Sequence, residues 1–249
     1  MNASDKQSDA GTTETKPRAL RPRDAATLVI LDHSTGEARI LMGRRRPDLV
    51  FMPNKYVFPG GRVDRSDRLA PCLDVLDAAE ERKLLVDMKG TPSRDRARAL
   101  ALAAVRETFE EAGLLIGSPI ERASMPAAAE RTSPSWQRFL DHGMRPRIGT
   151  LRLFARAITP PGRKRRYDTR FFTTPATEIA LRVDPPDNEL KSLDWFSLDE
   201  ARSLDLPSIT RAVLEDLSDR LTTREPPVAQ PVPFYFFRNG SFHRELITA

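Results

Sequence analysis

Apolar and polar residues alternate along the chain in short strand-like runs separated by turns. Residues 26–31 form a nearly continuous apolar run, and a turn at 34–37 leads to a second run at 38–43. Apolar runs of this length between turn residues are typical of buried strands, so the pattern predicts a β-hairpin. Further strands are predicted at 56–58, 151–158, 169–173 and 187–196, with a terminal hairpin over about 233–247 that turns at Asn239-Gly240.

Apolar residues at three- and four-residue spacing predict helices between these strands. One long helix would start from a cap at Ser93 or Asp95 and continue to Ala112, where Gly113 ends it. The other helical patterns span residues 73–88, 121–146 and 207–221. Strands interleaved with long helices predict an α/β layered domain.

The composition limits the domain organisation. With 249 residues, of which 39% are hydrophobic, the chain can bury one sizeable core. Residues 1–23 are rich in small polar and charged groups and have almost no large apolar ones, which predicts a disordered tail. We therefore expect a single domain over residues 24–249.

The strongest chemical signal is a group of three carboxylates near the end of the helix that precedes Gly113. Glu107, Glu110 and Glu111 stand at i, i+3 and i+4, so they fall on one helix face. Three negative charges this close repel one another unless a cation lies among them. Hard oxygen ligands favour Mg²⁺ or Mn²⁺, and the pattern therefore predicts a metal site.

The segment Arg106-Glu107-Thr108-Phe109-Glu110-Glu111-Ala112-Gly113-Leu114 resembles the signature box of the Nudix hydrolases, with Thr108 in an apolar slot of that pattern. The resemblance implies an α/β/α sandwich with a mixed sheet. It also implies a diphosphatase that cleaves a nucleoside diphosphate linked to another group. Glu107, Glu110 and Glu111 would then hold the metal ion, and Arg106 would fix one of these carboxylates by a bidentate pair.

The first half of the box differs from the family pattern in length. Arg106 follows Gly61 by 45 positions, where the family spacing would be 14, so about 31 residues are inserted. An insertion of this length, over about 68–97, favours a helical excursion. Counted forward from Gly61 with the family spacing, Asp67 takes the place of the first box carboxylate. Counted back from Arg106, Arg98 takes that place. The spacing leaves this assignment open.

Two further features belong to the expected site. Gly60 and Gly61 follow a short strand, where glycine lets the backbone take conformations closed to other residues and approach a ligand closely. The general base would be a glutamate of the cluster whose pKa its neighbours raise, or a residue from a loop outside the box, for which Glu189 is a candidate.

Basic residues gather in two places that would suit a phosphorylated substrate. The net charge of +5 comes from 40 basic and 35 acidic residues, so nucleic acid is not required as a partner. One cluster is Arg44, Arg45 and Arg46, and the other includes Arg165 and Arg166. A solvated surface is the alternative interpretation of each cluster.

The segment from Phe51 to Gly61, together with the insertion, resembles the peroxisomal coenzyme A diphosphatase branch of the family. That branch splits CoA or acyl-CoA into 3′,5′-ADP and (acyl-)4′-phosphopantetheine. A hydrolase of ADP-ribose, NADH or another nucleotide diphosphate is the alternative enzyme. A protein that binds nucleotides or RNA without turnover is the alternative from another class.

The sequence also gives expectations about the setting of the protein. No apolar run approaches the roughly 20 residues of a membrane span, and the N-terminus lacks a signal-peptide core. Cys72 is the single cysteine, and the last residues differ from a peroxisomal Ser-Lys-Leu address. We expect a cytoplasmic protein, and the sequence leaves a homodimer open.

Overall fold

The computed structural model describes residues 20–50, 52–120, 133–223 and 230–248. Among these residues a large mixed sheet has the strand order β10-β2-β1-β8-β7-β11-β12, with β3 paired to β2 and β4 to β1. The bounds of its strands are β1 Arg23–Asp32, β2 Arg39–Arg45, β3 Tyr56–Val57, β4 Gly60–Arg62, β7 Arg152–Ile158, β8 Tyr167–Pro175, β10 Leu190–Ser197, β11 Val232–Arg238 and β12 Ser241–Ile247. β1 and β8 run parallel at its centre.

A second, smaller sheet has the order β6-β5-β9, from Met144–Pro146, Leu114–Pro119 and Ile179–Arg182. The helices are α1 Ala78–Leu85, α2 Arg94–Ala112, α3 Pro134–Asp141, α4 Leu198–Arg202 and α5 Ser208–Thr222, with a short 3₁₀ helix at Arg65–Arg68. No helix in the described part of the chain is both long and apolar enough to cross a membrane.

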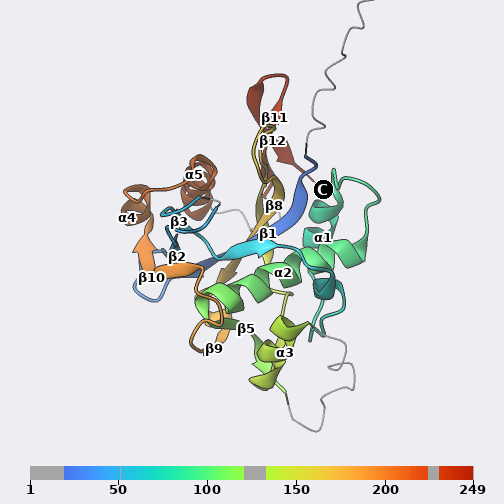
Figure 1. Ribbon diagram of the computed structural model, residues 1–249, viewed down its shortest axis with the longest axis vertical. Coiled ribbons are helices and arrows are strands. Elements are labelled where there is room, and N and C mark those ends of the chain that lie inside the picture. Colours follow the sequence, from blue (N-terminus) through green and yellow to red (C-terminus); the bar gives the residue numbers. More distant parts are fainter. Residues whose placement is uncertain (1–19, 51, 121–132, 224–229, 249) are drawn as a thin grey trace, which may run out of the picture.

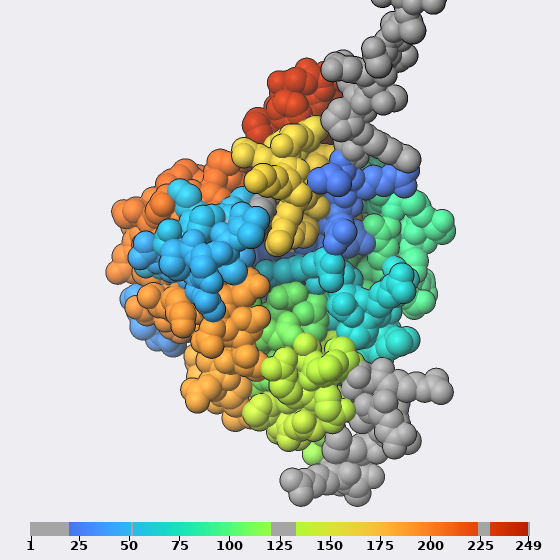
Figure 2. All heavy atoms as spheres, viewed as in Figure 1, coloured from blue at the N-terminus to red at the C-terminus, as the bar shows by residue number. Residues whose placement is uncertain are grey.

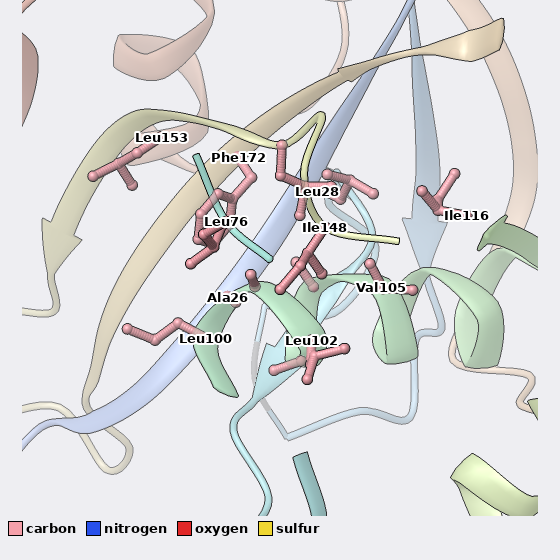
Figure 3. Close-up of a cluster of buried hydrophobic side chains, with 14 of the residues drawn as sticks. Ala26, Leu28, Leu76, Leu100, Leu102, Val105, Ile116, Ile148, Leu153 and Phe172 are labelled. Atoms are coloured by element: carbon pink, nitrogen blue, oxygen red, sulfur yellow. The ribbon is translucent and has the colours of Figure 1, made fainter. Parts of the chain in front are cut away.

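The large sheet lies between two layers of helices (Figure 1). On one side, α1 and α2 share a buried apolar cluster with alternate residues of β1, among them Ala26 and Leu28. Figure 3 shows this cluster, where side chains of α2 meet those of β1, β8 and the insertion. On the other side, α5 packs Val213 and Leu214 against a second cluster. This is the α/β/α arrangement that the sequence predicts.

Helix α2 begins and ends where the sequence predicts. The Ser93 side chain accepts a hydrogen bond from the Arg96 backbone N–H at its start. Gly113 ends it in a left-handed conformation, with φ of 65°, which only glycine adopts without strain. Its length from Arg94 to Ala112 carries the box residues along the sheet to the edge of the molecule near β10 and β9 (Figure 1).

The helix predicted over residues 73–88 is shorter than expected. Asp77 caps α1 by accepting hydrogen bonds from Ala79 and Glu80, and the helix ends at Leu85. Residues before Asp77 pair with the chain around β6 instead: the Leu73 N–H donates to the Pro146 carbonyl at 3.0 Å. These tertiary hydrogen bonds satisfy the backbone locally, so a helix there has no advantage.

The prediction of one helical segment over 121–146 is also wrong in part. Residues 121–132 lie outside the described residues. Of the remainder, only α3 is helical, and Met144–Pro146 forms β6, which pairs with β5. Neither short strand has a distinctive sequence pattern, and each is fixed by pairing with distant residues. The predicted tail similarly lies outside the described residues up to residue 19, and β1 begins at Arg23.

Buried ion pairs connect the neighbouring strands β7 and β8. Asp168 of β8 accepts two hydrogen bonds from Arg156 of β7 at 2.9 Å and contacts Arg170 Nη1 at 2.7 Å. All three side chains are at most 3% exposed. Burial alone would raise the pKa of Asp168, but the hydrogen bonds from Arg156 and the charge of Arg170 outweigh it and hold this pKa below its ordinary value.

Replacing Asp168 should therefore weaken the fold strongly. In Asp168→Asn, two buried guanidinium groups lose their shared counter-ion, and we expect the free energy of unfolding at pH 7 to fall by about 3–5 kcal/mol in urea denaturation. Because the pKa of Asp168 is lowered, the carboxylate contributes stability above roughly pH 4, and the difference from wild type should shrink as the pH falls through the lowered pKa.

Asp199→Asn is the matched control, because Asp199 pairs with Arg202 at 2.6 Å on the surface. An exposed pair contributes about 0–1 kcal/mol. Equal losses in the two variants would contradict the role given to the buried cluster.

Candidate active site

The last turns of α2 place the predicted box residues against β4. Arg106 and Glu111 are buried, while Glu107 and Glu110 keep about one seventh of their side chains exposed, at 15% and 14%. Thr108, in the apolar slot, points into the core and donates its hydroxyl to the Ala104 carbonyl at 2.8 Å. The helix itself thus satisfies the polar atom, which explains how threonine fits that slot.

Arg106 is the centre of the site's hydrogen bonding. Its Nη1 donates to Glu107 Oε1 at 2.9 Å and to Glu110 Oε2 at 2.6 Å. Its Nε and Nη2 make a bidentate pair with Asp67 at 2.8 and 3.0 Å, and Nη2 also donates to the Arg62 carbonyl at 2.9 Å. Five hydrogen bonds match the five N–H donors of a guanidinium, so its orientation is fully determined.

The structure brings Asp67, rather than Arg98, to the position beside Arg106. Asp67 lies in the 3₁₀ helix after β4 and is fully buried. Arg98 instead donates to the carbonyls of Arg68 and Ala70, so it attaches the start of the insertion to α2. The spacing left the position of the first box carboxylate unassigned, and the tertiary contacts place Asp67 there, next to Arg106.

Gly60 and Gly61 are adjacent to the glutamates, but for a different reason from the one expected. Neither has a positive φ. A Cβ on Gly61 would lie 2.5 Å from the carboxyl carbon of Glu107, and one on Gly60 would lie 2.6 Å from Thr27 Cα. The Gly60 N–H donates to Glu111 Oε2 at 2.8 Å. Glycine is therefore required by the close packing of β4 against β1 and the carboxylates.

The environment disfavours negative charge on two of the glutamates. Burial raises the pKa of Glu107 to about 7, with the charge of Glu110 adding to the effect and Arg106 opposing it. Burial and the charge of Glu107 raise the pKa of Glu111 well above its ordinary value. Buried carboxylates that repel one another are stabilised when a cation binds between them.

The donor set fits a divalent cation in its chemistry. Three carboxylates from one helix face supply hard oxygen ligands, and the raised pKa values show negative charge that the protein alone does not neutralise. In the described part of the chain, no three such side chains converge in a ready-made ligand group. Arg106 Nη1 bridges Glu107 and Glu110, and Glu111 faces Gly60, so ligation requires new side-chain rotamers.

Arg45 and Glu189 lie beside this cluster. Glu189 accepts from Arg45 Nη2 at 3.2 Å, and the charges of both residues act on Glu111. The strand pairing explains their proximity, because Leu190 of β10 is opposite Arg45 of β2. The predicted base candidate outside the box is thus near the glutamates, at 40% side-chain exposure.

The other predicted substrate-binding residues contact groups outside the glutamate cluster. Arg44 donates to the Asn54 carbonyl at 3.2 Å, and Arg46 pairs with Asp48 at 2.7 Å. Arg166 donates to the carbonyls of Thr159 and Leu20, and Arg165 is exposed in the same loop. In Figure 2 the light-blue chain around β2 and β3 and the yellow β7–β8 hairpin both lie on the face of the molecule that is in view.

One contact of the site was not foreseen from the sequence. The indole Nε1 of Trp136 in α3 donates to Asp67 Oδ1 at 2.9 Å. The sequence placed Trp136 only as an apolar position in a helical pattern, and no local signal connects it with residues 67 and 106. In the segment that resembles the coenzyme A branch, Tyr56 packs edge-on against Phe196, and Phe51 lies outside the described residues.

Known proteins resemble this chain over most of its length. A family model described as the NUDT19 Nudix domain matches residues 10–205. The acyl-coenzyme A diphosphatase NUDT19 of Gallus gallus is 30% identical over 244 residues, which cover 74% of this chain and 63% of the relative. The Homo sapiens protein of the same name is 30% identical over 212 residues, covering 66% and 54%. The chain thus spans less than two thirds of the length of these relatives.

A solved structure agrees with the fold. The NUDIX hydrolase from Alicyclobacillus acidocaldarius has a TM-score of 0.55 and 25% sequence identity, and the match covers 78% of this chain and 90% of that one. The residues that the family model matches include α2 with its carboxylate cluster. Because the family model matches well over half of the 249 residues, this chain belongs to the NUDT19 Nudix domain family.

Proposed function

We propose that this protein is a metal-dependent diphosphatase of CoA or acyl-CoA, which releases 3′,5′-ADP and (acyl-)4′-phosphopantetheine. The observation that carries the proposal is the group of Glu107, Glu110 and Glu111, held by Arg106 against Gly60 and Gly61. The named activity of the relatives from Gallus gallus and Homo sapiens supports the substrate class.

Mg²⁺ or Mn²⁺ is the proposed cofactor, and Glu107, Glu110 and Glu111 would hold it. When bound, the ion neutralises charge on the phosphoryl oxygens and lowers the pKa of the attacking water. The protein's own contribution is to gather the carboxylates in one place. Arg106 holds Glu107 and Glu110, and the Gly60 N–H holds Glu111, so each carboxylate would reach the ion by a change of side-chain rotamer.

Glu107 is the proposed general base. Burial raises its pKa to about 7 in the metal-free site, and a bound cation would lower this pKa, so at neutral pH Glu107 would be ionised and able to accept a proton. Arg106 Nη1 binds only its Oε1, so Oε2 has no contact with that guanidinium. Glu189 is paired with Arg45, and we assign it the role of holding this arginine beside Glu111.

The arginines near the cluster suit a substrate with several phosphates. CoA carries a 3′-phosphate in addition to its diphosphate, and Arg44, Arg45 and Arg46 follow one another in and just after β2, next to the site. Guanidinium groups bind phosphate oxygens with paired hydrogen bonds. ADP-ribose and NADH lack that third phosphate, so they would use fewer of these positive groups.

A protein that only binds nucleotides or RNA explains less of the structure. Binding of an anion is opposed by three carboxylates, two of which are pushed towards protonation by burial. The free-energy cost of burying these carboxylates is explained if a metal ion and a reaction depend on their oxygens. We also propose a cytoplasmic location, which the single cysteine supports.

The first test is a panel of diphosphates with purified protein and Mg²⁺ or Mn²⁺. We expect release of 3′,5′-ADP from CoA and acyl-CoA with a kcat/KM at least tenfold above that for AMP release from ADP-ribose or NADH, measured by chromatography. A chelator should abolish turnover, and added metal should restore it. Preference for ADP-ribose would contradict the CoA assignment, and no turnover of any diphosphate would contradict the hydrolase.

The second test removes ligand charge without changing side-chain size. Glu110→Gln and Glu111→Gln should each lower kcat by about 10²–10³-fold, since a metal ion supplies several kcal/mol of charge stabilisation. Glu215→Gln is the control, because Glu215 pairs with Arg202 on the surface of α5. If either ligand variant retains the activity of the control, that glutamate does not bind the catalytic ion.

A further inference from the structure

Asp67 accepts hydrogen bonds from every direction open to a carboxylate. Oδ1 accepts from Arg106 Nε at 2.8 Å and from Trp136 Nε1 at 2.9 Å. Oδ2 accepts from Arg106 Nη2 at 3.0 Å and from the Asp64 N–H at 2.7 Å. Four donors match the four lone-pair sites of an ionised carboxylate, so Asp67 has neither free capacity nor freedom to rotate.

The donor from Trp136 reaches Asp67 from a separate part of the chain. Ser133 caps α3 by accepting from the Trp136 N–H, and Pro134 begins the helix. Phe139 of α3 packs edge-on against Phe109 of α2, with ring centroids 5.4 Å apart. Trp136 is fully buried, so the core around it holds the indole in place.

We propose that Trp136 is a positioning residue for the metal-binding glutamates. Its indole N–H fixes Asp67, Asp67 fixes the guanidinium plane of Arg106, and Arg106 Nη1 fixes Glu107 and Glu110. This inference rests on the proposed function, because it gives the glutamates their role as ligands. Without the indole donor, Oδ1 keeps only Arg106 Nε, and the Asp64 N–H at Oδ2 is the one bond among these four that would still hold the carboxylate independently of Arg106.

A role in packing alone would need only the ring. Phenylalanine at position 136 would retain the aromatic contact with Phe139, which lies 5.5 Å away between ring centroids. Buried tryptophan N–H groups usually bond a polar partner, and here that partner directly binds the central arginine of the site. If Trp136 serves packing alone, loss of its N–H should leave the metal affinity unchanged. If Trp136 positions Asp67, loss of its N–H should weaken metal binding.

The test compares Trp136→Phe with Phe139→Leu, a matched control on the same helix that removes aromatic packing and leaves the hydrogen bond to Asp67. Mn²⁺ affinity is measured from the free-ion signal in electron paramagnetic resonance, alongside kcat and KM for CoA. Loss of an outer hydrogen bond to a metal site costs about 10–100-fold in affinity or activity. We expect Trp136→Phe to bind Mn²⁺ at least tenfold more weakly and to lose kcat by a similar factor, with KM for CoA unchanged.

Phe139→Leu should lose thermal stability but keep Mn²⁺ affinity and kcat within about twofold. The inference is overturned if Trp136→Phe binds Mn²⁺ as the wild type does, or if its losses equal those of Phe139→Leu. A double-mutant cycle adds a second check: Asp67→Asn combined with Trp136→Phe should bind Mn²⁺ no more weakly than Asp67→Asn alone.

A chemical variant keeps the test valid if Trp136→Phe does not fold. In a Trp195→Phe background, tryptophan is replaced by benzothienylalanine, which exchanges the indole N–H for sulfur in a ring of the same shape. Weaker Mn²⁺ binding supports the inference, and unchanged binding overturns it. If the wild type cleaves no diphosphate but its Mn²⁺ binding still depends on position 136, the proposed function is wrong and the positioning role of Trp136 stands.

Discussion

The candidate site depends on the buried ion pair between Arg106 and Asp67. Both side chains are withdrawn from water, where an unpaired charge would cost several kcal/mol, so each needs the other. The pairing is also directional. Once Nε and Nη2 bind the carboxylate, the plane of the guanidinium is set, and so are the directions of its three remaining hydrogen bonds. Nη1 then lies between Glu107 and Glu110. Because the buried Arg106 and Asp67 must pair, the pair also sets where Glu107 and Glu110 lie.

The insertion leaves this pair undisturbed because its first residues and its helix α1 are both anchored. Arg98 attaches the chain after Asp67 to α2 through the Arg68 and Ala70 carbonyls. Farther along, Glu80 of α1 accepts from the Leu153 N–H of β7 at 2.7 Å and pairs with buried Lys83 at 3.1 Å. The inserted residues are thus bonded to strand β7 of the large sheet and to α2. About 31 residues can enter the box without moving Asp67 from Arg106.

The site also combines rigidity with electrostatic tension. Its glutamates are held by short hydrogen bonds from Arg106 and Gly60, yet burial and mutual repulsion raise the pKa of Glu107 and Glu111. A fold that gained only stability from this helix would have apolar residues at these positions. The cost is consistent with a site prepared for a cation, whose charge replaces the protons that these carboxylates otherwise favour.

The sequence by itself determined the local features of this protein. The Ser93 cap, Gly113 and the i, i+3, i+4 glutamates predicted α2 and its chemical face, because caps and helix periodicity act over a few residues. It did not determine the extent of α1, the strands β5, β6 and β9, or the reason for the Gly60-Gly61 pair, since these follow from contacts with distant chain. Only the tertiary structure decided that Asp67 and not Arg98 lies beside Arg106, and that Trp136 completes the pair. Both depend on which segments pack together across the insertion, and no pattern of neighbouring residues encodes that packing.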